Sequence, residues 1–387
     1  MKKLNNYKIQ KRKDGRWYVQ VSFQKQKYYI YGSTQKEVKE KLSQRLRLIQ
    51  EAQANQIRNF SSANTSLYTW AKCCLENYSK AHVRGNTYAS YICILENYIL
   101  PLGNKKLNEI TNIMIQQHLI SLTKKNGKDK LSSKMLQNIR NFLSLVFRYA
   151  IQNDMLLRNP VKGIHIPQEY VREPRSLTLE EQNALILAAR QHSKPIMFSV
   201  ILALYTGLRK GELLGLQWQD IDFRKKRIAV TKQLVRQTNL KDDTRSKTSL
   251  QLVEPKTKAS IRFVFLIDDL AKDLLEYKEK MIEWKRENNY AHSETDFVFC
   301  NSQNGAIEPR RYYQYYMEVM EEASIENANF HTLRHTFTTR CLEAGLDIVS
   351  VSKILGHAEV QITANTYTHL LAEHQKAEMQ KIRKWYV

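Results

Sequence analysis

Hydrophobic and polar residues alternate most clearly near the start of the chain. In GRWYVQVSF every second residue from Trp17 is apolar, and the polar face of this predicted strand begins with Tyr18. The pair Asp14-Gly15 is a typical hairpin sequence, and KYYIYG (27–32) predicts a further strand. The pattern therefore predicts a small three-stranded sheet.

A helix is expected directly after this sheet. Thr34 and Glu37 have the spacing of a capping box, and apolar residues recur at helical intervals through KEVKEKLSQRLRLIQE (36–51). We place the sheet, with this helix covering one of its faces, in a first domain of residues 1–55. Residues 55–65 are polar and lack periodicity, which predicts a linker.

Helical periodicity dominates the next part of the chain. Apolar residues recur at intervals of three and four in four segments, which predict a four-helix domain of residues 66–160. The segments are residues 66–82, 86–103, 111–125 and 132–154, with helix caps expected at Ser66, Asn86, Thr111 and Ser132 or Ser133. Pro160 and Pro167 then predict an extended linker up to residue 175.

The rest of the chain is predicted to be mostly helical, with a small β-sheet. Thr178 and Glu181 have capping-box spacing at its start. Residues 222–235 and 255–266 are typical of strands, and the polar residues 237–251 between them predict a loop. The fold class is therefore α+β with several domains. We place this last domain at residues 176–375 and a tail at residues 376–387.

Composition adds a strongly basic character to this picture. The chain has 387 residues, with 61 Lys and Arg against 38 Asp and Glu, a net charge of +23. The first 50 residues contain 14 basic and 3 acidic residues, so +11 of this charge lies there. Such an excess is typical of proteins that bind a polyanion, because each phosphate contact releases counterions. A solvated basic surface is the alternative. An anionic membrane surface is disfavoured, because no basic helix with a continuous apolar face stands out.

Other patterns narrow the class of protein. The sequence has no run of 18 apolar residues and no signal peptide, so we predict a cytoplasmic protein. The five cysteines are odd in number and match no zinc or disulfide spacing, so we predict that all are reduced.

The most specific chemistry lies close to the end of the chain. HTLRH holds His331 and Arg334, LGH ends at His357, and TANTYTHL holds Tyr367. An arginine can bind a phosphate, imidazoles can handle protons, and a phenol can attack phosphorus. The set therefore suits attack on a phosphodiester without a metal ion.

A further arginine lies in the segment TGLRKGELLGLQWQDID. Arg209 follows Gly207 at the start of a predicted helix, where backbone N–H groups also favour an anion. Glu212 lies three residues further on and can fix the guanidinium. Taken alone, an arginine in such a place is more often an ordinary surface or ion-pair residue.

The histidines permit a second interpretation, because His331 and His335 have the four-residue spacing of metal ligands on a helix. No glutamate lies between them, however, and Arg334 would repel a cation. We therefore predict no metal site. His335 and His369 are expected to have structural, supporting roles.

Together, in this order and spacing, these motifs resemble the tyrosine recombinase (phage integrase) family, and the resemblance covers nearly the whole chain. It implies an enzyme whose nucleophile, Tyr367, forms a covalent 3′-phosphotyrosyl intermediate with DNA and needs no metal, ATP or other cofactor. The other catalytic residues that it implies are Arg209, His331, Arg334, His357 and a lysine, with Glu212 in support. The family lysine lies on a turn of the small sheet, where Lys256 and Lys258 are both candidates. We prefer Lys256 because of its distance from the second strand.

The resemblance also implies a division of labour. It assigns binding of arm-type DNA to residues 1–55, binding of core DNA to 66–160 and catalysis to 176–375. The expected DNA contacts of the first domain are Lys11, Arg12, Lys13, Arg16 and Tyr18.

The implied function is site-specific recombination that integrates and excises a mobile element or prophage, associated with the nucleoid. The implied partners are double-stranded core and arm attachment sites, bound by a homotetramer. An excisionase or directionality factor and a host DNA-bending protein are candidate partners.

Three rival functions remain. A non-catalytic, sequence-specific DNA-binding protein could share the scaffold, but the complete set of residues argues against lost activity. A type IB topoisomerase-like enzyme shares the nucleophile, but the separate basic first domain favours recombination at specific sites. An RNA-binding or membrane-surface protein rests on charge alone.

Overall fold

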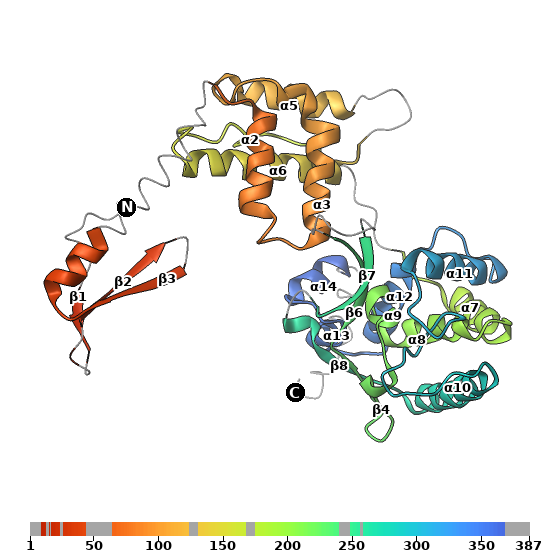
Figure 1. Cartoon of the computed structure of the whole chain (residues 1–387). Helices are drawn as coiled ribbons and strands as arrows, with labels where there is room; N and C mark the ends of the chain where they lie inside the picture. The colour runs from red at the N-terminus through yellow and green to blue at the C-terminus, as the bar shows by residue number, and fades with distance from the viewer. Residues whose placement is uncertain are drawn as a thin grey trace, which may run out of the picture. The chain divides into compact units, whose positions relative to one another are not determined.

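The computed structural model in Figure 1 confirms an α+β chain with small sheets and predominant helices. It describes residues 9–12, 15, 17–23, 26–43, 64–123, 131–167, 175–239, 248–255 and 258–367. The chain divides into two compact units, residues 1–169 and 170–387. The first unit contains two separate hydrophobic cores, one in the N-terminal sheet and one in the helices that follow.

The N-terminal sheet has the predicted three antiparallel strands, in the order β1-β2-β3. Their bounds are β1 Ile9–Lys11, β2 Trp17–Phe23 and β3 Gln26–Gly32. A helix over residues 35–43 covers one face, where Val19, Val38 and Leu42 are buried. Asp14 and the predicted helix beyond residue 43 lie outside the described residues.

The predicted capping box before this helix is half right. The Thr34 hydroxyl accepts a hydrogen bond from the Glu37 backbone N–H (3.1 Å), as expected. The Glu37 carboxylate, however, accepts from the backbone N–H (2.7 Å) and the hydroxyl (2.6 Å) of Ser33, one residue earlier than the capping box requires.

The helical part of the first unit agrees with the periodicity. Its elements are α2 (Leu67–Cys74) and α3 (Gly85–Ile94), each extended by a π-helical turn (Leu75–Ser79 and Leu95–Ile99), then α4 (Leu100–Gly103), α5 (Asn112–Thr123) and α6 (Ser133–Gln152). Ser66 and Ser132 cap α2 and α6, and Thr111 accepts from the Met114 N–H at the start of α5. The cap predicted at Asn86 is wrong: α3 begins at Gly85 after an extended Arg84 whose side chain makes no cap hydrogen bond.

The second unit is mostly helical with a β insert, as the hydrophobic pattern predicted. Its helices are α7 (Leu179–Gln191), α8 (Phe198–Thr206), α9 (Lys210–Leu214), α10 (Asp268–Glu287), α11 (Pro309–Glu322), α12 (Phe330–Glu343), α13 (Ile348–Leu355) and α14 (Val360–Thr366). The capping box of Thr178 and Glu181 at the start of α7 is confirmed.

The β insert forms two sheets instead of one. β4 (Ile221–Asp222), β5 (Arg227–Val230) and β8 (Arg262–Phe265) form one, and β6 (Gln233–Thr238) pairs with β7 (Thr248–Val253) in the other. The loop predicted at residues 237–251 is therefore wrong at both ends, because strand pairing continues to Thr238 and resumes at Thr248.

A central helix pair positions the site. α8 is buried along almost its whole length, and α12 packs against it while burying polar side chains, among them Arg334. Gly207 caps the C-terminal end of α8 and Gly356 caps that of α13, both with left-handed backbone (φ 62° and 68°). Glycine adopts this conformation without strain. The two helix ends therefore present backbone carbonyls to α12.

Candidate active site

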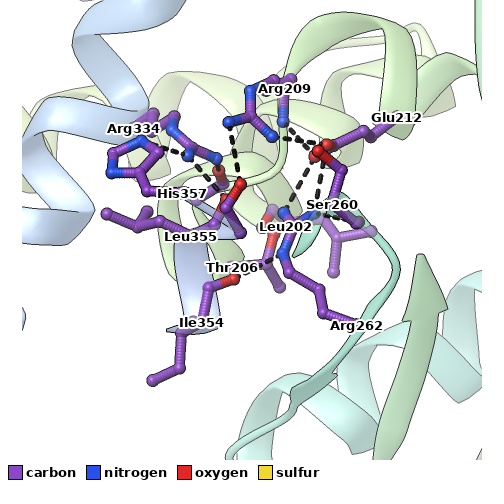
Figure 2. Close-up of polar contacts among 12 residues, drawn as sticks. Leu202, Thr206, Arg209, Glu212, Ser260, Arg262, Arg334, Ile354, Leu355 and His357 are labelled. Atoms are coloured by element: carbon purple, nitrogen blue, oxygen red, sulfur yellow. Dashed lines mark hydrogen bonds and ion pairs between the residues drawn. The ribbon is translucent and has the colours of Figure 1, made fainter. Parts of the chain in front are cut away.

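Arg209 lies where the sequence predicted, at the start of α9, and its side chain is 34% exposed. Its Nη1 donates to Glu212 Oε1 (2.8 Å), and its backbone N–H donates to Glu212 Oε2 (2.9 Å). Nη2 donates to the carbonyl of Gly356 at the end of α13 (3.4 Å). The predicted role of Glu212 in fixing the guanidinium is therefore visible as a direct ion pair (Figure 2).

Arg262 is a site residue that the sequence analysis missed. Its Nη1 and Nη2 donate to the two carboxylate oxygens of Glu212 (3.1 and 2.9 Å), and its Nε donates to the carbonyl of Ile354 (2.5 Å). Figure 2 shows Glu212 between Arg209 and Arg262. The available signal was alternation in β8: Arg262 shares a face with buried Val264, and an inward-facing charge in a strand requires a partner.

Glu212 is the buried anion of this cluster, with 4% of its surface exposed. Burial raises the pKa of its carboxyl, but hydrogen bonds and charge from Arg262, followed by those from Arg209, outweigh it and hold the pKa below the usual range. The carboxylate therefore stays ionised and offsets one of the surrounding positive charges.

Arg334 is the most buried member of the cluster, at 3% exposure on α12. Its Nη1 donates to the carbonyl of Gly207 (2.7 Å), and its Nη2 donates to the carbonyl of Leu355 (2.7 Å). Three arginines thus bond to the consecutive carbonyls of Ile354, Leu355 and Gly356 at the negative end of α13. Burial, and then the charge of Arg209, lower the pKa of Arg334 to about 9, so it remains a cation at neutral pH.

His357 follows α13 and contacts Arg334 directly. Arg334 Nη2 donates to His357 Nε2 (2.9 Å), so Nδ1 carries the ring proton and donates to the Thr363 hydroxyl (2.8 Å). Burial, Arg334 and Arg209 lower the pKa of His357 to about 4. The imidazole is therefore neutral at neutral pH. Thr363, on α14, is a second partner that the sequence did not indicate.

Tyr367 follows α14 and is buried, with 5% of its surface exposed. Its hydroxyl lies 2.6 Å from His335 Nδ1. Burial raises the pKa of the phenol, while the Thr338 hydroxyl and the Arg334 charge act in the opposite direction. His335, expected only to support the structure, is therefore in direct contact with the predicted nucleophile.

His331 lies one helical turn before His335, and the two rings meet edge to face with centroids 4.9 Å apart. Burial lowers the pKa of His331, and so do the charges of Arg334 and Arg209. α12 thus carries His331, Arg334 and His335 within 5 residues of chain.

The predicted lysine is not decided by the structure. Lys256 lies outside the described residues. Lys258 begins a short 3₁₀ turn, Lys258–Ser260, just before β8. Both lysines remain predictions, as do Lys13, Arg16 and His369, which also lie outside the described residues.

One face of the N-terminal sheet carries three neighbouring tyrosines, among them the predicted contact Tyr18. Exposed Tyr29 and Tyr31 lie beside Tyr18, with ring centroids 6.1 to 6.4 Å apart. The Arg12 guanidinium lies over the Tyr31 ring (5.7 Å). On the opposite face of the sheet, where Trp17 packs against the core, Lys11 Nζ lies 5.7 Å from the Trp17 centroid. Binding of DNA by these side chains remains a prediction.

The described part of the chain contains neither a group of potential metal ligands nor a membrane-spanning helix. Among these residues, no three His, Cys, Asp or Glu side chains are grouped as metal ligands would be. None of the described helices combines the length and the apolar character needed to cross a membrane.

The site combines a cluster of arginines with a buried phenol, an arrangement suited to the transfer of a phosphodiester to a tyrosine. Residues 175–374 match the model of the phage integrase family, and residues 67–122 match the phage integrase N-terminal SAM-like domain. The chain belongs to the phage integrase family, and its enzymatic class is that of the tyrosine-type site-specific recombinases.

Individual relatives agree with this assignment. A XerC-like tyrosine recombinase of Caldanaerobacter subterraneus is 30% identical over 371 residues, 92% of each chain. The ICEBs1 integrase of Bacillus subtilis is 27% identical over 388 residues, covering 97% of this chain and 98% of the relative. The structure of the Tn1549 transposon integrase in complex with a circular intermediate DNA is similar in fold. It has a TM-score of 0.67 at 20% identity and covers 82% of this chain and 100% of that one.

Replacing Glu212 with glutamine is expected to destabilise the second unit at neutral pH. The change leaves Arg209 and Arg262 without their shared counter-charge, and breaking a buried ion pair typically costs about 3–5 kcal/mol. Because the pKa of Glu212 is lowered on folding, its contribution is present above the usual carboxyl value of 4.5. That contribution is lost as the pH falls through the lowered value. Urea unfolding of both proteins from pH 7 down to pH 3 should show a steady difference at neutral pH that shrinks as the pH falls below 4.5. A difference that stays constant over this whole range would contradict the assignment.

Proposed function

We propose that this recombinase breaks and rejoins duplex DNA with Tyr367 as nucleophile, and that Arg209 and Arg334 bind the scissile phosphate. The observation that carries the proposal is the convergence of α8, α12, α13 and α14 on one cluster. There Arg334 bonds to His357, while the phenol bonds to His335 on the same helix as Arg334. A buried phosphodiester in attack gains negative charge on its nonbridging oxygens, and preorganised guanidinium groups stabilise it there.

The proposed reaction exchanges one phosphodiester for another. The phenol oxygen of Tyr367 forms a bond to phosphorus, the bond from phosphorus to the 5′ oxygen breaks, and a 3′-phosphotyrosyl intermediate results. Lys256, with Lys258 as the alternative, protonates the leaving 5′ oxygen. The proton of the attacking phenol passes to His331 or His357 as general base, and the other histidine bonds to the phosphate. A 5′-hydroxyl from the partner strand then attacks the intermediate, so rejoining requires no ATP.

We further propose that the functional assembly is a homotetramer on two attachment sites. Exchange between two duplexes requires cleavage of four strands, and each copy contributes one nucleophile. In this assembly residues 66–160 and 176–375 bind core DNA, and residues 1–55 bind arm sites through Lys11, Arg12, Lys13, Arg16 and Tyr18. Two observations support a DNA partner. The net charge is +23, and the N-terminal sheet has stacked tyrosines, one of which lies under the Arg12 guanidinium.

The cellular role that we propose is integration and excision of a mobile element or prophage on nucleoid DNA in the cytoplasm. The similarity to an ICEBs1 integrase and to a transposon integrase in complex with a circular intermediate DNA supports this role. An excisionase or directionality factor, together with a host DNA-bending protein, would determine whether integration or excision takes place.

A plasmid assay tests the proposal against its rivals. Attachment sites are first recovered by selecting duplexes that the full chain binds from a randomised pool. The protein is then incubated, without metal or ATP, with a plasmid carrying two such sites and with the same plasmid lacking them. Deletion or inversion of the DNA between the sites is expected only for the first plasmid. Relaxation of both plasmids without recombination would indicate a topoisomerase, and binding without any strand cleavage would indicate a non-catalytic DNA-binding protein.

A further inference from the structure

The resting place of the Tyr367 phenol is defined on two sides. Its ring packs in a small cluster with buried Leu342, Val351 and Leu355, from α12 and α13. Its hydroxyl makes a 2.6 Å hydrogen bond to His335 Nδ1. Apolar packing fixes the depth of the ring, but it has no direction, so polar contacts orient the oxygen. These are the 2.6 Å contact to His335 and an interaction with the Thr338 hydroxyl, also on α12.

The same short helix is tied to the site at a second point. Thr363 is fully buried on α14, and its hydroxyl accepts from Nδ1 of His357, whose other nitrogen accepts from Arg334. α14 is therefore held at Thr363 by the phosphate-binding cluster and just after its end by His335. The second tie leads to α12, where Arg334 immediately precedes His335 in the chain.

We propose that His335 is the positioning residue of the nucleophile: its Nδ1 holds the Tyr367 hydroxyl and so aligns the phenol with the arginine cluster before DNA is bound. This inference rests on the proposed role of Tyr367. It gives the contact with the phenol to His335, for which the sequence predicted only a structural role, and not to His331. In the structure His331 meets the His335 ring but has no described hydrogen bond to the phenol.

The chemistry of His335 suits orienting the phenol by a hydrogen bond better than accepting its proton. Burial, His331 and Arg334 lower its pKa to about 4, so the imidazole is neutral at neutral pH and binds a proton weakly. A neutral imidazole can donate or accept one hydrogen bond at Nδ1, depending on its tautomer. An asparagine side chain carries both a donor and an acceptor at a similar distance from the backbone. It can therefore replace the hydrogen bond in either direction, but it cannot take up a proton.

Full-length variants separate these roles in a single-turnover assay. The substrate is a nicked duplex carrying the attachment site, from which the cleaved strand diffuses away and traps the covalent adduct. His335→Phe and His335→Ala are expected to slow adduct formation by roughly tenfold to a hundredfold, because misplacement of a reacting group by about 1 Å can cost that much. His335→Asn is expected to stay within a few-fold of the wild type. DNA affinity and thermal unfolding identify any variant that fails to fold.

Each outcome decides the proposal. Wild-type rates for both apolar variants would overturn it, and so would an asparagine variant as slow as the folded apolar ones. Rescue by asparagine alone supports it, since a role in packing would not distinguish asparagine from alanine in this way. Failure of the proposed function would look different, because the wild type itself would then form no adduct with Tyr367.

Discussion

Replacing Tyr367 with phenylalanine is expected to abolish the covalent protein–DNA adduct, because the substitution removes the only atom that attacks phosphorus in the proposed reaction. The ring remains, so its packing with Leu342, Val351 and Leu355 is preserved. The variant loses the hydrogen bond to His335, which typically contributes about 0.5–1.5 kcal/mol to stability. We therefore expect a folded protein that binds DNA as tightly as the wild type.

The measurement is a denaturing gel of protein mixed with end-labelled, nicked attachment-site DNA. The wild type should give a labelled adduct in which the protein is joined to the 3′ phosphate of the 5′-labelled strand, and the DNA-linked peptide should contain Tyr367. The variant should give no adduct. Tyr290→Phe is a matched control: it removes the hydroxyl of a tyrosine that stacks on Trp284, after α10, outside the site. An adduct in the Tyr367 variant would show that another residue is the nucleophile.

Local sequence patterns predicted the parts of the site that depend on neighbours in the chain. Arg209 and Glu212 are three residues apart at a helix start, and a single helix carries His331 and Arg334. The spacing of these residues along the chain is enough to bring them together, so periodicity and capping rules can predict their proximity. The nucleophile's identity came from the resemblance, because 21 tyrosines occur in the chain and periodicity does not single one out.

The parts of the site that the sequence did not predict depend on tertiary contacts. Arg262 reaches Glu212 across 50 residues of sequence, and Tyr367 reaches His335 across 32. The carbonyls that hold the arginines are backbone atoms at the end of α13, and no side-chain pattern reveals them. These contacts exist only once β8, α12 and α13 have packed.

In the fold, too, local patterns were predicted from the sequence and features without a local pattern were not. Helices with a buried face and the alternating N-terminal strands were predicted, because burial imposes a period on their sequences. The β6–β7 pair was mostly missed. All residues of β7 from Thr248 to Val253 are exposed or half-buried, so neither face of this two-stranded ribbon requires a continuous apolar row.

A lysine in place of Arg209 or Arg334 is expected to lower the rate of DNA cleavage by about a hundredfold to a thousandfold, the usual effect of removing one preorganised donor to a developing oxyanion. Lysine keeps the charge, but it offers a single point donor instead of a planar fork. At position 209 it cannot bond to Glu212 and Gly356 as the guanidinium does while also holding a phosphate oxygen. At position 334 it cannot reach the carbonyls of Gly207 and Leu355 together.

The two variants should differ in stability, so that an effect on catalysis can be distinguished from an effect on folding. Arg209 is one-third exposed, so Arg209→Lys should change the unfolding free energy little, whereas Arg334→Lys disrupts buried bonds between α8, α12 and α13 and should lower it clearly. Single-turnover cleavage and urea unfolding measure both effects. Arg190→Lys is the control, because the Arg190–Asp273 pair lies on the surface, where such pairs contribute about 0–1 kcal/mol. Arg209 would lose its assigned role if Arg209→Lys cleaved DNA at the same rate as this control, since its remaining charge would then suffice without the geometry of the guanidinium.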